Sequence, residues 1–545
     1  MSFTALDAAA AQATGDRATV WLARTASVTV VVLACIRLAW VGDDALITLR
    51  TALNLTHGWG PGFNATESVQ GYTHPLWFLL WVAIGSGTGQ WILGILAVSI
   101  ALTGAAVALI AIQVVTVARL VVVTVLLVLS NAFIEYSTSG LENPLAYATV
   151  GLLVVLTLGS PRAQRLPAVA RGALFGLVTA ACVLTRLDLA LIIAPALAVV
   201  LWSNRRDLRL LLSFLAGLLV PALVWFAWSY ASYRVLLPNT FSAKRNLDIP
   251  TAELVVQGLR YLWVTFETDP VTMVALAAGV GGAIAFGTVV TRAWAGGLIL
   301  YLAYIVWIGG DFMVGRFLAV PVYVAVFLLA VTHRPDSPKV ARSALESGPT
   351  LLAIAAVVLL LIGCSSAGRT PAALTASQQQ RWTVDWNTMG GIADERAFWG
   401  AGRSLGNIVF NLALAYTQPD FVGPSTGASL TRSLREIDKA AKNWPSTDTA
   451  VGKPDDVAVL CGGLGQAGIA SGPRVHLVDE CALTDRFLAD RPATARDFQW
   501  RIGDFHRPIP DGYVDALHAD NPGLLKNPED AVALARLWAQ IRPNG

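Results

Sequence analysis

Two adjacent carboxylates, Asp43 and Asp44, stand directly after an apolar run that extends from about Val28 to Val41. A carboxylate inside a bilayer costs roughly 2.5 to 3.5 kcal/mol on insertion scales, so a pair of acids is best placed at the water boundary. There one of them can stay ionised and accept a proton as a general base. The other interpretation is that the two acids only end the helix and face solvent. We favour a site, because a helix end does not need the long polar and aromatic loop that follows.

The segment behind the acidic pair combines a helical pattern with polar and aromatic side chains. Leu46, Leu49 and Leu53 repeat at helical spacing. Arg50 lies on another face, and this pattern predicts a helix that lies along the membrane interface and roofs a pocket. Tryptophan and tyrosine at this depth are also ordinary interfacial anchors. The loop nevertheless carries a set of groups that could stack on sugar rings or bond to hydroxyls: Asn64, Glu67, Tyr72, His74 and Trp77.

Composition sets the protein class. Hydrophobic residues make up 55% of the 545-residue chain, charged residues 14%, and the mean hydropathy is +0.58. A soluble domain of this length could not solvate so much apolar surface, so the sequence predicts a polytopic α-helical membrane protein embedded in a lipid bilayer. The net charge of +3 comes from 39 basic and 36 acidic residues, a balance that gives no reason to expect nucleic acid as a partner.

The positions of the basic residues predict the orientation in the membrane. By the positive-inside rule, the short basic loops and the N-terminus lie in the cytoplasm. The first apolar segment lacks the order of a cleaved signal and is expected to be retained. The intervening loops then lie outside, and they carry nearly every unusual polar residue. The basic residues that set this orientation are Arg162, Arg165, Arg171, Arg205, Arg206, Arg209, Arg292, His333, Arg334, Lys339 and Arg342.

Apolar segments predict about eleven transmembrane helices, with the N-terminus inside and the C-terminus outside. The stretch 75–133 divides into three pieces, at residues 85–90 and at Arg119, but it needs an even number of crossings. One of these pieces is therefore expected not to cross fully. The candidate segments lie near residues 25–41, 75–133, 144–159, 172–186, 189–203, 210–231, 270–291, 293–308, 317–332 and 349–364.

Beyond Cys364 the chain becomes polar, which predicts two domains: a transmembrane catalytic domain over 1–364 and one soluble extracytoplasmic α/β domain over 365–545. Cys461 and Cys481 could form a disulfide in an oxidising compartment, and two buried free thiols are the alternative.

The C-terminal domain is rich in tryptophan, a side chain that stacks well on the apolar faces of sugars. We therefore expect it to pack on the membrane site and to help hold a glycan, with segment 393–399 as the preferred contact. The alternative for any single tryptophan is core packing. The residues concerned are Trp382, Trp386, Trp399, Trp444, Trp500 and Trp538.

Residues 463–468 match the glycine spacing of a dinucleotide-binding fingerprint, between predicted strands at 456–460 and 475–478. Asp479 follows too early for the usual contact with a ribose, and nucleotides are not supplied outside the membrane. We interpret the motif as a plain turn between a strand and a helix in a small α/β core.

The other outer loops bring more charge to the same side. Their cations stand against the positive-inside bias, so a bound anion such as a lipid phosphate is a natural partner. The alternative is neutralisation within the protein, of Arg186 by Asp188 and of Arg316 by Asp311, and both interpretations stay open for these two arginines. For Lys244 and Arg245 we favour phosphate. Two further polar candidates for substrate binding are Glu142 and Asn239.

Taken together, these features resemble the GT-C superfamily of glycosyltransferases, which take sugars from polyprenyl phosphates. More narrowly, seven motifs resemble the mycobacterial terminal β-(1→2)-arabinofuranosyltransferases. They are DDALITLR at 43–50, NLTHGWG at 54–60, FN at 63–64, GYTHPLW at 71–77, LPNTF at 237–241, GDFM at 310–313 and RIGDFHRP at 501–508.

The resemblance implies a GT-C-type fold in the cell membrane with the active site outside. It implies transfer of arabinofuranose from decaprenylphosphoryl-arabinose to the ends of cell-wall arabinan, in arabinogalactan and lipoarabinomannan. The residues suggest the chemistry: Asp43 or Asp44 takes the proton of the acceptor hydroxyl, and the outer cations stabilise the departing phosphate. A β-linked donor and a β product mean retention, through an enzyme-bound sugar or by front-face attack.

Two other functions remain open at this point. One is a different GT-C enzyme that transfers mannose or forms another arabinose linkage. The other is a transporter of lipid-linked sugars, which is less favoured because binding residues near mid-membrane in two repeated halves are not recognisable. A divalent metal could sit beside the paired acids, but no ligand cluster accompanies them, so we expect no metal and no other cofactor.

Overall fold

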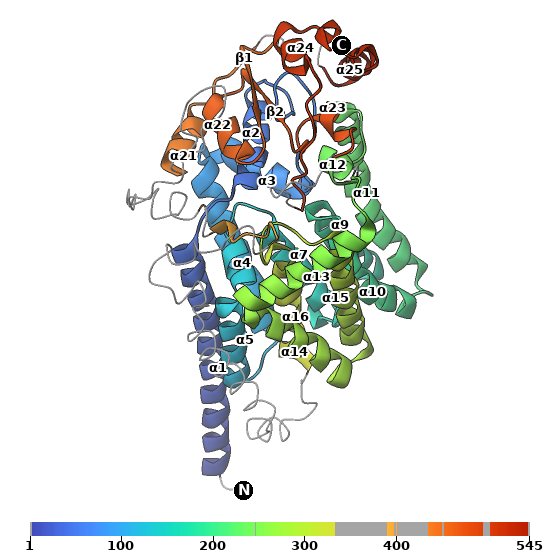
Figure 1. The fold of residues 1–545 in the computed structure, drawn as a ribbon. Coiled ribbons are helices and arrows are strands. Elements are labelled where there is room, and N and C mark those ends of the chain that lie inside the picture. Colours follow the sequence, from blue (N-terminus) through green and yellow to red (C-terminus); the bar gives the residue numbers. More distant parts are fainter. Residues whose placement is uncertain are drawn as a thin grey trace.

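The structure is a computed structural model that describes residues 3–245, 247–332, 390–396, 399, 434–448, 452–493 and 502–542. A helical bundle is formed by the chain up to residue 332, and a C-terminal unit formed by residues 452–542 lies over one end of it (Figure 1). The N-terminal end of the first helix points away from this unit (Figure 1). The predicted segment 349–364, Cys364, Trp382, Trp386 and Trp500 fall outside the described residues.

Long apolar helices form the bundle. Five helices in the described part of the chain are long and apolar enough to cross a membrane: α1 (Phe3–Leu38), α4 (Trp91–Ala111), α9 (Ala168–Thr185), α11 (Leu208–Tyr233) and α15 (Val289–Ile308). Helices α13 (Thr251–Thr268) and α14 (Pro270–Phe286) pass the same test as a pair, with a bend of 109° between them. Five shorter apolar helices accompany them: α3 (Pro75–Thr88), α5 (Val117–Leu129), α7 (Asn143–Thr157), α10 (Leu189–Ser203) and α16 (Ala319–Thr332).

This mostly helical architecture is that of a polytopic membrane protein, whereas the figure of eleven spans stays a prediction. The remaining helices of the bundle are α2 (Asp43–Thr56) and the short elements α6 (Asn131–Tyr136), α8 (Pro161–Gln164), α12 (Asn239–Arg245) and η1 (Arg316–Leu318).

The stretch 75–133 forms three helices, α3, α4 and α5, as its interruptions predict. The first break follows Gly89, whose left-handed backbone (φ 66°) ends α3. The second break lies at residues 112–116, so Arg119 stands in the first turn of α5 and not at the break.

Helix α13 was not anticipated from the sequence. One face exposes Val256, Leu259 and Trp263, whereas Gly258 is buried on the other. A Cβ on Gly258 would lie 2.3 Å from the carbonyl oxygen of Val306, so glycine permits close packing on α15. Helix α13 therefore covers the bundle with one face and turns an apolar stripe outward, as helices in a membrane interface do.

The C-terminal unit contains a β-α-β element. Strand β1 (Asp456–Leu460) pairs in parallel with β2 (Val475–Asp479), Leu460 standing opposite Asp479, and α22 (Leu464–Ser471) is the crossover helix. The two predicted strands thus correspond to β1 and β2. The other elements are α23 (Arg486–Ala489), α24 (Tyr513–Ala519), η4 (Pro522–Leu524) and α25 (Pro528–Ile541), and α21 (Leu434–Lys442) precedes the unit.

The unit has an apolar core of its own, which includes Val478, Leu488, Leu517, Leu534 and Trp538. The indole N–H of Trp538 donates to Glu67 at 3.1 Å, and that of Trp444 donates to Asn54 at 3.2 Å. Both rings are buried, so the core-packing interpretation holds for these two tryptophans. Glycan binding by this domain stays a prediction.

Helix α2 lies between the bundle and the C-terminal unit. It was expected to lie along the lipid interface, and all of its residues from Ala45 to Asn54 are buried. The reason is that α22 packs against it: a Cβ on Gly465 would lie 2.1 Å from the carbonyl oxygen of Asp43. The C-terminal unit thus covers the face that the sequence assigned to the interface, and the position of α2 relative to the membrane stays a prediction.

Arg50 stabilises the contact between α2 and α22. It is therefore not available as the substrate-binding residue that the sequence suggested. Its guanidinium is fully buried and donates to the carbonyl oxygens of Gly468 at 3.0 Å, Gly472 at 3.1 Å and Val475 at 2.8 Å. It also lies 4.5 Å from the centre of the Phe63 ring. Burial lowers the pKa of Arg50 to about 9.

The α2–α22 contact predicts a specific sensitivity to one methyl group. Gly465→Ala should lower the free energy of unfolding by roughly 1 to 3 kcal/mol, because the new Cβ meets backbone and Leu46. Gly296→Ala in α15 is the matched control, since a Cβ there meets nothing within 4 Å. The measurement is the melting temperature of purified protein in detergent, followed by tryptophan fluorescence. Equal melting temperatures for both variants would contradict the packing described here.

Candidate functional site

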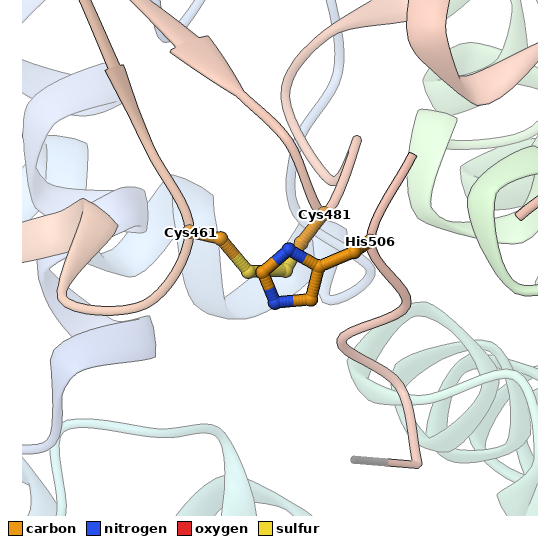
Figure 2. A group of neighbouring side chains, drawn as sticks. All are labelled: Cys461, Cys481 and His506. Atoms are coloured by element: carbon orange, nitrogen blue, oxygen red, sulfur yellow. A yellow bond between two sulfur atoms is a disulfide. The ribbon is translucent and has the colours of Figure 1, made fainter. Parts of the chain in front are cut away.

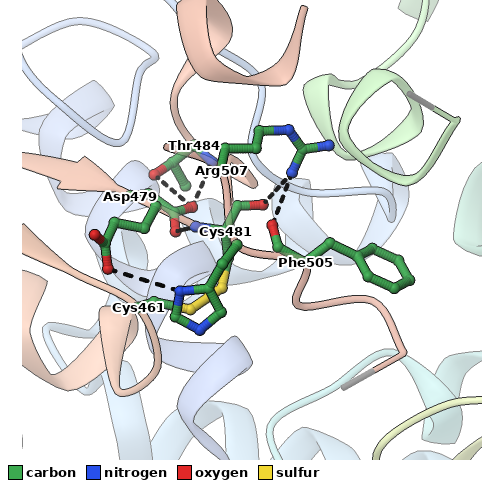
Figure 3. The surroundings of a disulfide bond; sticks show 8 residues. Cys461, Asp479, Cys481, Thr484, Phe505 and Arg507 are labelled. Carbon is green, nitrogen blue, oxygen red and sulfur yellow. Dashed lines mark hydrogen bonds and ion pairs between the residues drawn. A yellow bond between two sulfur atoms is a disulfide. The ribbon is translucent and has the colours of Figure 1, made fainter. Parts of the chain in front are cut away.

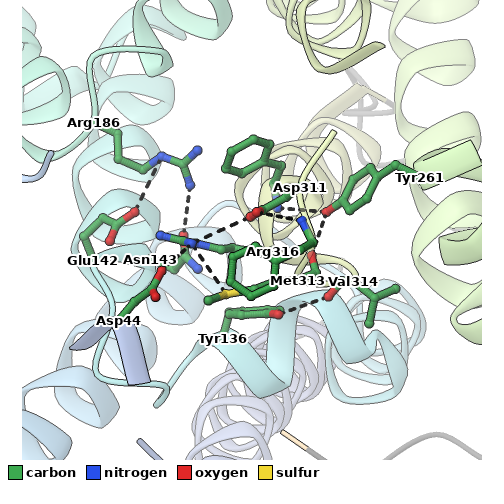
Figure 4. A network of polar contacts seen from close by, with 12 residues as sticks. Asp44, Tyr136, Glu142, Asn143, Arg186, Tyr261, Asp311, Met313, Val314 and Arg316 are labelled. Carbon is green, nitrogen blue, oxygen red and sulfur yellow. Dashed lines mark hydrogen bonds and ion pairs between the residues drawn. The ribbon is translucent and has the colours of Figure 1, made fainter. Parts of the chain in front are cut away.

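Charged side chains from five places in the chain meet at one end of the bundle, and Figure 4 shows the contacts among several of them. They come from the first turn of α2, from the loops before α3 and α7, from the α9–α10 connection and from the α15–α16 connection. The positive-inside rule predicts that these loops lie on one side of the membrane, and the contacts bring them together. The group, called the charged cluster below, consists of Asp44, His74, Glu142, Arg186, Asp188, Asp311 and Arg316.

Arg316 connects acids from two different elements. Its Nη1 donates to Oδ2 of Asp44 at 3.0 Å and lies 3.7 Å from Oδ2 of Asp311. Oδ1 of Asp311 accepts the backbone N–H of Phe312, and its buried Oδ2 accepts no hydrogen bond from the described residues. Burial raises the pKa of Asp311, and the charge of Arg316 opposes this rise.

Arg186 is held by a bidentate pair with Asp188. Its Nε lies 3.1 Å from Oδ1 and its Nη2 lies 2.6 Å from Oδ2 of that carboxylate. The hydroxyl of Tyr301 donates to Asp188 at 2.9 Å and lies at the same distance from Arg186. The sequence left two partners open for Arg186, a lipid phosphate or Asp188, and the structure shows the pairing with Asp188.

His74 and Glu142 occupy the buried side of the cluster. Nε2 of His74 lies 2.9 Å from the Thr48 hydroxyl, and its Nδ1 lies 3.3 Å from Oε2 of Glu142. Burial lowers the pKa of His74, and the charge of Glu142 opposes this effect. Burial alone would raise the pKa of Glu142, but the charges of His74 and Arg186 lower it.

The two adjacent aspartates have different surroundings. The carboxylate of Asp43 is buried and accepts the backbone N–H groups of Gly465 at 2.8 Å and Gln466 at 3.0 Å, at the N-terminus of α22. The side chain of Asp44 is 29% exposed and is paired with Arg316. The sequence left the choice of base between Asp43 and Asp44 open. Because the two oxygens of Asp43 are already bonded, the geometry favours Asp44.

The glycine-rich motif at 463–468 is explained by the same contact. Backbone N–H groups at a helix N-terminus are a ready site for an anion, and a dinucleotide fingerprint uses them for phosphate. Here the carboxylate of Asp43 occupies that position. Gly468 allows the approach of Arg50, because a Cβ there would lie 2.8 Å from Cδ of that side chain.

Several predicted sugar-binding residues lie in the interface between the bundle and the C-terminal unit, where they bond to protein groups, although the buried Oδ1 of Asn239 has no hydrogen bond from the described residues. Asn64 bonds to the backbone N–H and carbonyl of Leu477, both at 3.0 Å. Asn239 donates to the carbonyl oxygens of Ala482, Leu483 and Asp485.

The remaining predicted contacts of the first outer loop are also internal. Glu67 accepts the indole N–H of Trp538, which the sequence could not reveal. The hydroxyl of Tyr72 lies 3.0 Å from that of Tyr233, and the indole of Trp77 donates to the Gly140 carbonyl at 2.8 Å. These side chains are buried, and their polar atoms hold the loop to its neighbours.

The basic pair on α12 divides between two positions. Lys244 is exposed, and a Cβ on Gly503 would lie 3.3 Å from its Nζ and 4.0 Å from the Phe312 ring. The charge of Lys244 also helps to lower the pKa of Asp311 against the effect of burial. Lys244 therefore borders the charged cluster. Arg245 is exposed and lies 6.0 Å from the centre of the Phe241 ring, with no charged partner among the described residues.

The sequence did not indicate Tyr301, and it placed Asn143 in an outer loop without selecting it as a site residue. Tyr301 is a fully buried tyrosine within the apolar helix α15, and a hydroxyl inside an apolar run is the signal that could have identified it. Asn143 accepts from Nη1 of Arg186 at 3.4 Å. The segment expected to approach the site does so: the backbone of Ala393 pairs with Phe312 at 2.7 Å and with Val314 at 2.9 Å.

One group in the described residues brings three potential metal ligands within 4.8 Å of one another, Cys461, Cys481 and His506 (Figure 2). The two cysteines form a disulfide, so their sulfur atoms are not available as thiolates. The carboxylates of the charged cluster do not form such a group. Their nearest polar neighbours include guanidinium groups, which suit anions better than cations.

Comparison with known proteins identifies two relatives. This chain is 27% identical to a terminal β-(1→2)-arabinofuranosyltransferase of Mycobacterium tuberculosis over 569 aligned residues, which cover 93% of this chain and 86% of the relative. Over 345 residues, 54% of this chain and 48% of the relative, it is 26% identical to a protein of the same name from Corynebacterium glutamicum. Neither a protein-family profile nor a solved structure matches the chain.

These relatives confirm the resemblance carried by the sequence motifs. The chain is homologous to proteins named terminal β-(1→2)-arabinofuranosyltransferase, which are glycosyltransferases.

Proposed function

We propose that the protein transfers arabinofuranose from decaprenylphosphoryl-arabinose to the non-reducing ends of cell-wall arabinan and forms terminal β-(1→2) linkages. The names of the relatives supply the sugar and the linkage. The observation in this chain that carries the proposal is the pair of Asp44 and Arg316, a partly exposed carboxylate next to a guanidinium. The reaction takes place at the outer face of the cell membrane, under the C-terminal unit.

Asp44 activates the acceptor. A sugar hydroxyl is a poor nucleophile near neutral pH, and a carboxylate within hydrogen-bond reach takes its proton as the new bond forms. The hydroxyl oxygen bonds to the anomeric carbon of the donor, and the bond from that carbon to the phosphate oxygen breaks. The polyprenyl phosphate leaves with the electron pair, and the proton remains on Asp44.

Cations assist the departure of the phosphate. The leaving group already carries negative charge, so it needs positive charge nearby and no general acid. Arg316 is next to Asp44, and Lys244 stands exposed at the border of the charged cluster. Arg186 is bonded to Asp188 and contributes its field from the buried side.

The stereochemistry follows from donor and product. A β-linked donor and a β product require retention, by two displacements through an aspartyl-bound sugar or by front-face attack. The step described above is the front-face route, in which Asp44 is the base. In the two-displacement route Asp44 is the nucleophile: it bonds to the anomeric carbon as the phosphate leaves, the acceptor oxygen then replaces it, and the acceptor proton passes to the released carboxylate. Asp44 takes both roles because the oxygens of Asp43 are bonded to α22. Linkage analysis of the product separates this function from transfer of another sugar, and transfer of radiolabelled arabinose separates it from transport.

The role of Asp44 gives the first test of this function. Asp44→Asn should lower the rate of arabinose transfer by roughly 10² to 10⁴-fold, the usual contribution of a general base. The melting temperature should not change, because the replacement is nearly isosteric and the side chain is partly exposed. Asp455→Asn, in an exposed ion pair with Arg474, is the matched control and should keep the parent rate. The measurement uses radiolabelled decaprenylphosphoryl-arabinose and a synthetic arabinofuranose acceptor. A parent rate in Asp44→Asn would refute the assignment.

Lys244 and Arg245 should differ in their effect on the donor. Lys244→Ala should raise the apparent KM for decaprenylphosphoryl-arabinose by about tenfold, the effect of losing one charge-assisted contact of about 1.4 kcal/mol. Arg245→Ala should change it less than about twofold, because exposed charges away from the cluster contribute little. A KM change confined to the acceptor would assign Lys244 to the glycan side, and equal effects of the two variants would remove the distinction.

A further inference from the structure

The disulfide between Cys461 and Cys481 joins the ends of the two paired strands (Figure 3). Cys461 directly follows β1, and the short loop that it begins, residues 461–463, leads into α22. Cys481 stands two residues after β2. The disulfide is thus the covalent link between the start of the α22 loop and the turn after β2.

The Cys481 side of this link is firmly held. Asp479 accepts the backbone N–H groups of Cys481 and Thr484, both at 3.0 Å. Arg507 donates to the carbonyl oxygens of Cys481 at 3.2 Å and Phe505 at 3.0 Å, and these bonds converge around the disulfide (Figure 3). The turn after β2 is therefore fixed by its own hydrogen bonds.

The Cys461 side has little support of this kind. Gly462 (φ 83°) and Gly463 (φ 63°) both adopt left-handed backbone conformations. The loop is partly buried, but a Cβ on either glycine would meet nothing within 4 Å, so no neighbouring group packs against these two positions. Glycine loses the most conformational freedom on folding, so two glycines without such contacts do not fix a loop by themselves. The disulfide anchors this loop to the fixed turn.

The loop matters because α22 begins directly after it. The first N–H groups of α22, those of Gly465 and Gln466, are the two donors to the carboxylate of Asp43. Asp43 precedes Asp44 in the first turn of α2. A displacement of the α22 N-terminus would release Asp43 and shift the backbone that carries Asp44.

We propose that the Cys461–Cys481 disulfide and Asp43 act together as a positioning device for Asp44, so that reduction of the disulfide slows glycosyl transfer. This inference rests on the proposed role of Asp44. A dithiol reductant supplies the two electrons and two protons: the S–S bond breaks, each cysteine becomes a thiol, and the dithiol becomes a disulfide. Cys461 is partly exposed, with the ring of His506 alongside (Figure 2), so a small reductant can reach the bond.

The first experiment does not depend on activity. Hydrogen exchange of the full chain in detergent is measured by mass spectrometry on a peptide that covers residues 464–471, with and without dithiothreitol. Reduction should speed exchange of the first amides of α22 by about tenfold or more, since local opening no longer works against the covalent link. The variant Cys461→Ser with Cys481→Ser is the matched control: its first α22 amides should exchange fast without dithiothreitol, and the reductant should not change their exchange rate. Unchanged exchange after reduction, with reduction verified by thiol labelling, would overturn the proposal.

The second experiment tests the coupling to Asp43. The double serine variant and Asp43→Asn should each lower kcat by about tenfold, and their combination should lower it no further, because groups that act as one unit are not additive. The KM for decaprenylphosphoryl-arabinose should stay within about twofold in all three variants, because none of them is expected to touch the donor. If the combined variant instead lost kcat by the product of the two separate effects, the disulfide and Asp43 would act independently, and the proposed positioning of Asp44 would be refuted.

Failure of the proposed function itself looks different. In that case the parent and Asp44→Asn would transfer arabinose equally, or neither would transfer it. The hydrogen-exchange result would still decide whether the disulfide holds the N-terminus of α22.

Discussion

The contact between α2 and α22 is the constraint on which the rest of the site depends. Helix α2 carries both aspartates, and it is buried between the bundle and the C-terminal unit. A buried charge needs hydrogen-bond partners, because its loss of hydration is otherwise costly. The carboxylate of Asp43 and both Nη atoms of Arg50 find partners in backbone groups of the β-α-β element, whereas Nε of Arg50 has no hydrogen bond to the described residues. These bonds hold a polar helix in the interior of the protein.

The charged cluster follows the same rule with a different outcome. Its members neutralise one another: Arg186 forms ion pairs with Asp188 and Glu142, and Arg316 forms ion pairs with Asp44 and Asp311. Neutralisation is incomplete at Asp311, where a buried carboxylate oxygen lacks a hydrogen bond from the described residues. Buried polar atoms without partners and a partly exposed carboxylate are what a site for a polar substrate offers, because the substrate can supply the missing bonds.

The β-α-β element also shows how one arrangement of atoms serves different purposes. A helix N-terminus after a glycine-rich turn presents backbone N–H groups to an anion. In this protein the anion is a side chain of the same chain, and the glycines permit two helices to touch. Glycine spacing by itself therefore does not identify a nucleotide site, and the conclusion from topology that the motif is a structural turn agrees with the contacts.

The sequence by itself determined the features that depend on local pattern. Apolar length gave the membrane class and most helices, polar interruptions divided residues 75–133 into three, and alternating turn and strand signals located β1 and β2. The acidic pair and the outer loops were identified as a site because charge near a membrane is costly wherever it stands. Tertiary structure alone decided which of these residues face substrate. Arg50, Asn64 and Glu67 bond to partners 418, 413 and 471 positions away in the chain, and no local pattern carries that information. The same long-range packing separates Asp43 from Asp44: α22 binds one carboxylate and leaves its neighbour to Arg316, because adjacent residues on a helix point in different directions.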